Sequence, residues 1–62
     1  MKLKDIISLV EFDDLLIGVY NEAHMVEEFP KSDNEKVKEY EDYMASGIWI
    51  LNESTLCTNV YI

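Results

Sequence analysis

The chain has 62 residues, which is room for one hydrophobic core, so residues 1–62 are expected to form a single acidic domain. A core of this size rarely supplies more than about 3–5 kcal/mol of stability, and the single cysteine, Cys57, excludes an intramolecular disulfide. Thirteen carboxylates against five lysines, with no arginine, give a net charge of -8. Because nucleic acid is also negative, this charge argues against direct nucleic-acid binding and favours a basic protein as partner. The alternative is that the acidic residues serve solubility alone.

The cellular compartment follows from two features of the sequence. A single cysteine and the lack of a signal-peptide pattern favour a reducing compartment. The longest apolar run, residues 15–20, is too short to cross a bilayer. We therefore expect a cytoplasmic protein that does not act at a membrane.

The first third of the chain predicts a helix followed by a strand. Leu3, Ile6, Ile7 and Val10 follow the i, i+3, i+4, i+7 spacing of one apolar helix face. Residues 15–20 predict a strand, and residues 21–22 are its expected turn.

Residues 23–29 are compatible with two structures. As a helical turn they would bring His24 beside Glu28. As a strand they would pair back on residues 15–20, and Pro30 would end the pairing. The strand is favoured because two short β-type runs then flank one turn.

The second half predicts a helix and a hairpin. Ser32 and Glu35 form a capping-box pattern that begins a helix. This helix carries Tyr40 and Met44 on one face and is expected to end at Gly47. Residues 48–51 and 55–62 predict two strands joined by a turn. The order α-β-β-α-β-β predicts an α+β fold with a four-stranded, mainly antiparallel sheet and two helices on one face.

Strand alternation predicts a second, apolar face of this sheet. If Ile17, Val19, Ile48 and Ile50 face the helices, the opposite face carries Leu16, Tyr20, Trp49, Leu51 and Tyr61. An exposed apolar face of this kind marks an interaction surface, either for a partner or for a homodimer. The alternative is that the last strand wraps around and buries these rings in one core.

Catalysis is not expected, and no residue is assigned a catalytic role. His24 is the single imidazole and Cys57 the single thiol, and neither lies in a catalytic motif. No cofactor is expected. Zinc is the alternative, with His24, Glu28 and Cys57 as candidate ligands beside Glu27, but in a strand His24 and Glu28 would lie about 13 Å apart.

The opening MKLKDIISLV, the later VKEYEDY and the closing hairpin resemble small acidic proteins of phages and mobile elements of Gram-positive bacteria. These include the anti-CRISPR inhibitors of Cas9-type nucleases, some of which are acidic DNA mimics. The resemblance is one of pattern, so it carries over no functional residue. It implies a phage-encoded inhibitor that binds a defence effector stoichiometrically in the host bacterial cytoplasm.

Two groups of side chains are the candidate partner contacts for such an inhibitor. The aromatic anchors are Tyr20, Trp49 and Tyr61, because such rings often carry the binding energy of interfaces. A self-associating phage or plasmid accessory protein without a host target is the alternative, as is a small zinc-stapled binding domain. The acidic candidates are Asp13, Asp14, Glu22, Glu27, Glu28, Glu39, Glu41 and Asp42.

Overall fold

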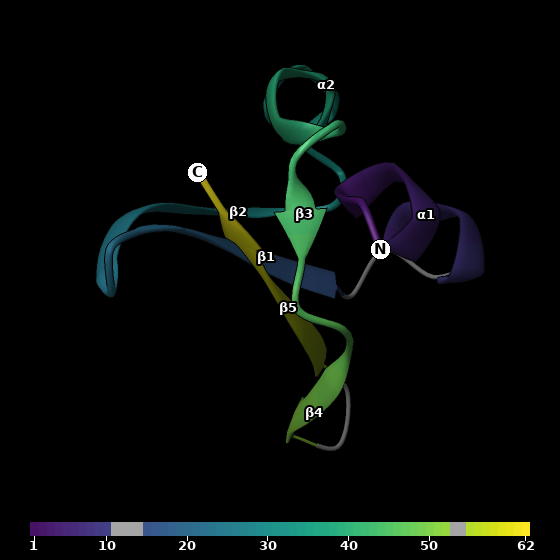
Figure 1. Cartoon of the computed structure of the whole chain (residues 1–62). Helices are drawn as coiled ribbons and strands as arrows, with labels where there is room; N and C mark the ends of the chain where they lie inside the picture. The colour runs from purple at the N-terminus through teal and green to yellow at the C-terminus, as the bar shows by residue number, and fades with distance from the viewer. Residues whose placement is uncertain (11–14, 53–54) are drawn as a thin grey trace.

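The fold combines two short helices with one mixed β-sheet (Figure 1). The computed structural model describes residues 1–10, 15–52 and 55–62. In chain order its elements are α1 (Leu3–Leu9), β1 (Leu15–Asn21), β2 (His24–Pro30), α2 (Asn34–Tyr40), β3 (Met44–Ala45), β4 (Trp49–Asn52) and β5 (Thr55–Tyr61).

β1 and β5 lie side by side at the centre of the sheet and run parallel, with Leu15 opposite Leu56 and Tyr20 opposite Tyr61. β2 pairs antiparallel with the other edge of β1. The far edge of β5 is shared by two short strands, because β3 pairs with its C-terminal end and β4 with its N-terminal half. The spatial order is therefore β2-β1-β5, followed by β3 and β4 together.

The predicted α+β class with two helices is confirmed, but the predicted four-stranded, mainly antiparallel sheet is wrong in two respects. The central pair is parallel, and it joins segments about forty positions apart in the sequence, which local patterns do not reveal. The sheet also has a fifth strand, β3, where the sequence predicts helix. The N-terminal segment pairs with β3 through its backbone. The amide of Ala45 donates to the Met1 carbonyl at 2.7 Å, and Lys2 forms an isolated β-bridge with Met44.

α2 begins one residue later than the capping box predicts and ends earlier than Gly47. Its N-cap is Asp33, whose carboxylate accepts from the Lys36 amide, so Ser32 is not the cap. Aspartate and serine are equally good N-caps, and the Asp33 amide is already held by the Pro30 carbonyl in the preceding turn. After Tyr40 the chain turns, and the side chain of Met44 is exposed.

The strand at residues 23–29 is confirmed as β2, but the turn before it is shifted by one residue. Its central residues are Glu22 and Ala23, with φ of 50° and 74°. Two consecutive positive φ values are the signature of the type I′ turn that suits a two-residue hairpin. The register also shifts between Val19 and Tyr20, which leaves Val26 as an extra residue in β2.

The core lies between the helices and one face of the sheet, so both helices cover the same face, as predicted. The expected α1 stripe is confirmed, since Leu3, Ile6 and Val10 are buried and Ile7 packs beside them. They meet alternate residues of β1 and β5 together with two aromatic side chains, and the full set of these partners is Leu15, Ile17, Val19, Phe29, Tyr40 and Val60.

β4 projects beyond the helices (Figure 1). Ile48 and Ile50, which were predicted to face the helices, are 39% and 75% exposed. Each helix has only seven residues, about 10 Å of length, and does not reach this end of the sheet. Leu51, predicted on the opposite face, lies outside the described side chains. Neither described helix is long and apolar enough to span a membrane.

Candidate functional site

The face of the sheet that points away from the helices carries the aromatic side chains expected there. We call it the open face and define it by Leu16, Gly18 and Tyr20 of β1, Met25 and Glu28 of β2, Trp49 of β4, and Cys57, Asn59 and Tyr61 of β5. Trp49 is 42% and Tyr61 50% exposed, and the Tyr20 and Tyr61 rings lie 6.3 Å apart between centroids. The rings are therefore displayed, and the alternative that buries them in one core is wrong.

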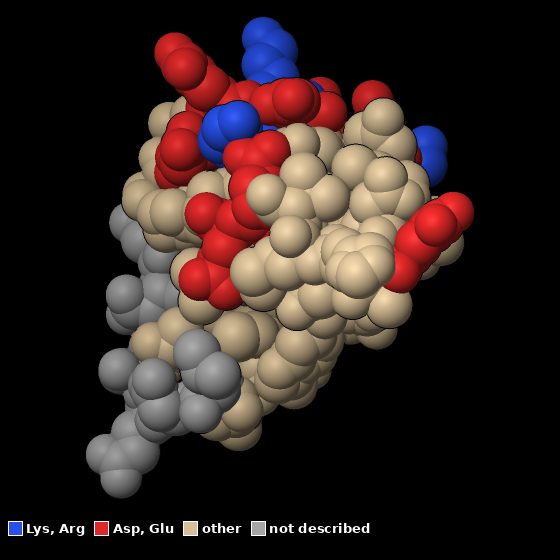
Figure 2. Space-filling view, turned by 90° about the vertical axis from the view of Figure 1, so that its left-hand side faces the viewer, with Lys and Arg blue, Asp and Glu red and all other residues tan. Residues whose placement is uncertain are grey.

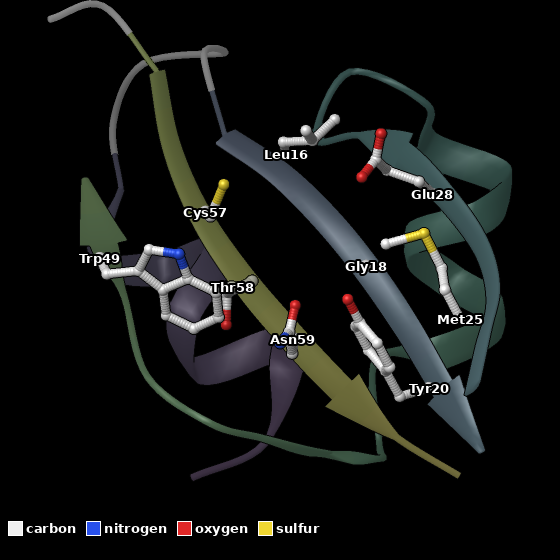
Figure 3. A pocket seen from close by; sticks show the side chains of 9 residues that line it. All are labelled: Leu16, Gly18, Tyr20, Met25, Glu28, Trp49, Cys57, Thr58 and Asn59. Carbon is white, nitrogen blue, oxygen red and sulfur yellow. The ribbon is translucent and has the colours of Figure 1, made fainter. Parts of the chain in front are cut away.

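A groove of about 200 Å³ crosses the open face. Side chains from four strands surround it: Met25 and Glu28 lie on one side, Trp49 on the other, and β1 and β5 run between them (Figure 3). Pockets for small-molecule ligands usually measure about 300–1,000 Å³. The groove is therefore small for a cofactor and is better matched to a single side chain of a partner.

Gly18 forms the floor of this groove because it has no side chain to fill it. A Cβ at this position would lie 3.1 Å from Oδ1 of Asn59, 3.2 Å from Cε2 of Tyr20 and 3.6 Å from Cε of Met25. These three groups thus close in on Gly18, so that even one added methyl group would be tight there. A glycine inside a strand often marks a place where another group approaches the backbone closely.

The bulge in β2 brings Met25 and Glu28 to the same face. In regular alternation, residues three apart point to opposite faces of a sheet. The extra residue, Val26, resets the alternation, so that Met25 stands beside Tyr20 while Glu28 pairs with Gly18 in the register. The bulge thereby places a thioether and a carboxylate on the same wall of the groove (Figure 3).

Cys57 lies in the groove but is poorly suited to nucleophilic chemistry. Its side chain is only 8% exposed, and burial, aided by the negative charge of Glu28, raises the pKa of its thiol. A thiol that stays protonated is a weak nucleophile. His24 is exposed at the start of β2 and does not line the groove, so the two residues do not form a catalytic pair there.

The acidic candidates do not form one surface with the groove. Glu28 lines it, whereas Glu22 lies in the β1–β2 turn and Glu39 belongs to α2. Glu41 and Asp42 follow α2 directly, and Asp42 pairs with Lys4 at 3.2 Å. In Figure 2 carboxylates and lysines gather in the upper part of the view, at the level of α2, above a broad uncharged area. The candidates Asp13 and Asp14 lie outside the described residues.

Glu27 is engaged inside the protein and is a structural residue. It points to the helix side of the sheet, where its carboxylate accepts from the Tyr40 hydroxyl at 2.5 Å and pairs with Lys36 at 2.8 Å. These two interactions, that with Lys36 first, lower the pKa of Glu27, and the carboxylate in turn raises the pKa of Tyr40 to about 12. Glu27 thereby ties β2 to α2.

The zinc candidates are not assembled into a site within the described part of the chain. Cys57 and Glu28 both line the groove, but His24 stands apart from it. Across residues 1–10, 15–52 and 55–62, no group of three or more His, Cys, Asp or Glu side chains is arranged to hold a metal ion.

No protein-family model, curated protein or solved structure matches this chain. The open face and the charge of the molecule therefore carry the functional interpretation. Sequence reasoning found the aromatic rings of this face but did not place four further residues in its groove, among them Cys57, which it considered as a nucleophile or a zinc ligand. The signal that could have found the groove is the glycine inside the predicted strand 15–20. These four residues are Gly18, Met25, Cys57 and Asn59.

Proposed function

We propose that the protein is a binding module that acts by stoichiometric contact with a basic protein partner through its open face. The observation that carries this proposal is the display of Trp49 and Tyr61, half exposed, beside a groove sized for one side chain. Partly exposed aromatic rings next to a small pocket are typical of interface anchors. The thiol in the groove, Cys57, has a raised pKa and is a weak nucleophile.

The charge of the molecule supports a basic partner. A net charge of -8 on 62 residues creates a negative potential that accelerates the approach of a positive protein. A second copy of the chain carries the same charge and is repelled at long range. The open face therefore suits a foreign, positively charged surface better than it suits another copy of itself.

The partner class that we propose is a nucleic-acid-handling defence effector of the Cas9 type, with the protein acting as a phage-encoded inhibitor in the bacterial cytoplasm. Such effectors hold nucleic acid in positively charged channels. An acidic domain with an aromatic docking face could occupy such a channel or block a moving lobe beside it. The resemblance of the sequence pattern to small acidic phage proteins, which include anti-CRISPR inhibitors, supports this choice.

The test is cleavage of target DNA by a panel of Cas9-type effectors, with the protein added before or after the DNA. A stoichiometric binder stops inhibiting when the effector is in excess, whereas an enzyme would continue to inactivate it. We expect titratable inhibition that is strongest when the protein is added first. If no effector in the panel is bound or inhibited, the proposed partner class is wrong.

Self-association is the second candidate, because β4 offers a specific surface for it. β4 pairs only with β5 among the described strands, and Ile48 and Ile50 beside that edge are exposed. An apolar edge strand can pair with a second chain. Sedimentation at micromolar protein distinguishes the two: a dimer that dissociates on Ile50→Lys would favour this candidate, and a monomer would exclude it.

A further inference from the structure

We propose that the groove above Gly18 receives the side chain of an arginine residue of the basic partner. This inference rests on the proposed function and names the chemistry of the partner residue that the open face recognises. In this arrangement the guanidinium lies in the groove beside Glu28 and Asn59, and its aliphatic stem lies along the apolar walls.

The groups around Gly18 are electron-rich. Oδ1 of Asn59 stands 3.1 Å from the missing Cβ, and the terminal methyl of the Met25 thioether lies 3.6 Å from it. Glu28, which pairs with Gly18 in the register, adds a full negative charge. Carboxylate and amide oxygens accept hydrogen bonds, and aromatic faces attract cations. Such surroundings attract a cation and repel an anion.

Glu28 is available for a partner. Within the described part of the chain its carboxylate makes no hydrogen bond or ion pair, in contrast to Glu27, which is held by Lys36 and Tyr40. Its field already reaches the groove, since it contributes to raising the pKa of the Cys57 thiol, although burial contributes more. A negative charge at the groove wall without a counter-charge favours an incoming cation.

Arginine fits these surroundings better than lysine does. Its planar guanidinium can stack on an aromatic ring and donate two parallel hydrogen bonds to a carboxylate at the same time. Lysine presents a compact, strongly hydrated charge that cannot stack. The protein itself contains no arginine, so no intramolecular arginine competes for the groove.

The experiment uses three capped pentapeptides with Arg, Lys or citrulline at the centre and glycine elsewhere. Citrulline has nearly the shape of arginine but no charge. Each peptide is titrated into the full-length protein, and the amide of Gly18, the side-chain amide of Asn59 and the indole N–H of Trp49 are followed by NMR. For an isolated side chain we expect saturable binding of the Arg peptide, with a dissociation constant on the order of 1 mM.

Three variants distinguish binding in the groove from non-specific attraction to the net negative charge. Glu28→Gln removes the charge at nearly constant shape. It is expected to raise the dissociation constant of the Arg peptide at least about tenfold. Gly18→Ala narrows the floor, where the new Cβ would lie 3.1 Å from Asn59, and is expected to weaken it as well. The matched control is Glu35→Gln, which removes one charge from the exposed first turn of α2 and is expected to leave binding unchanged.

The outcomes are distinct. Equal binding of the Arg and Lys peptides would overturn the assignment to arginine, and equal binding of citrulline would overturn the role of charge. An Arg peptide that moves none of the three signals up to a concentration on the order of 10 mM would overturn the inference altogether. If that happens while Trp49→Ala still abolishes binding of an intact effector, the proposed function stands without the arginine site. If the peptide binds as expected and no effector does, the partner class fails instead.

Discussion

Thr58 lies in β5 opposite Ile17 of β1, and its side chain is completely buried. Its hydroxyl makes no hydrogen bond with any described residue. A buried polar group without a partner loses its hydration without compensation, which costs about 1–3 kcal/mol. Thr58 is therefore a weak point in a core that is small from the outset.

Replacing this hydroxyl with a methyl group should strengthen the core. We expect Thr58→Val to raise the free energy of unfolding by about 1 kcal/mol, because it removes the desolvation penalty at nearly constant shape. Chemical denaturation measures the change. The reciprocal control is Val60→Thr, which buries a new hydroxyl and should destabilise the protein by about 1–3 kcal/mol. A loss of stability in Thr58→Val would show that the hydroxyl is satisfied.

The pair of Tyr40 and Glu27 makes stability depend on pH at the alkaline end. Tyr40 has an ordinary pKa of 10.0 and one of about 12 in the folded protein, chiefly because its hydroxyl donates to Glu27. A raised folded pKa contributes stability that is complete below pH 10 and is lost as the pH rises towards 12. At about two pH units below the ordinary tyrosine pKa, we expect Tyr40→Phe to be less stable than the parent. This difference in the free energy of unfolding should disappear as the pH rises from 10.0 to about 12. A gap that stays constant through the window would contradict the hydrogen bond.

At the scale of elements, the β1–β2 hairpin closes through two residues that lack the usual turn chemistry. Glu22 and Ala23 both adopt positive φ, a conformation that glycine accepts without steric cost. We expect Ala23→Gly to stabilise the hairpin by about 0.5–1 kcal/mol. Glycine removes the steric cost of a positive φ, and this gain exceeds the extra conformational entropy that glycine loses on folding. Thermal unfolding measures the change. Gly47→Ala, at φ 117°, is the opposite control and should destabilise. A lower melting temperature for Ala23→Gly would argue against the type I′ turn.

The sequence predicts those elements whose pattern is local. The stripe of α1 and the alternation of β1 follow directly from the spacing of apolar residues, and the structure has both. The parallel pairing of β1 with β5 and the strand β3 depend on segments that meet only in the folded chain. The same holds for the groove, because the bulge at Val26 decides which face Met25 and Glu28 share. The aromatic half of the open face was therefore predictable and its polar half was not.

At the scale of the whole molecule, the two faces of the sheet have different roles. One face holds the core against α1 and α2, and the other displays aromatic side chains that a soluble monomer would ordinarily cover. The net charge of -8 opposes self-association at long range and draws in basic proteins. Raising the salt concentration should therefore slow association with a basic partner more than it speeds dissociation, as stopped-flow mixing at several ionic strengths would show.

The most direct test of the open face is calorimetric titration of the protein into a Cas9-type effector that lacks DNA. We expect one-to-one binding, and Trp49→Ala should weaken it by about 2 kcal/mol or more, as loss of an interface anchor does. The matched control is Leu9→Ala, which truncates an exposed apolar side chain on α1, and this variant should bind as the parent does. Circular dichroism verifies that both variants are folded. Two results would contradict the account. Trp49→Ala could bind with the affinity of the parent, or Trp49→Ala and Leu9→Ala could weaken binding by the same amount.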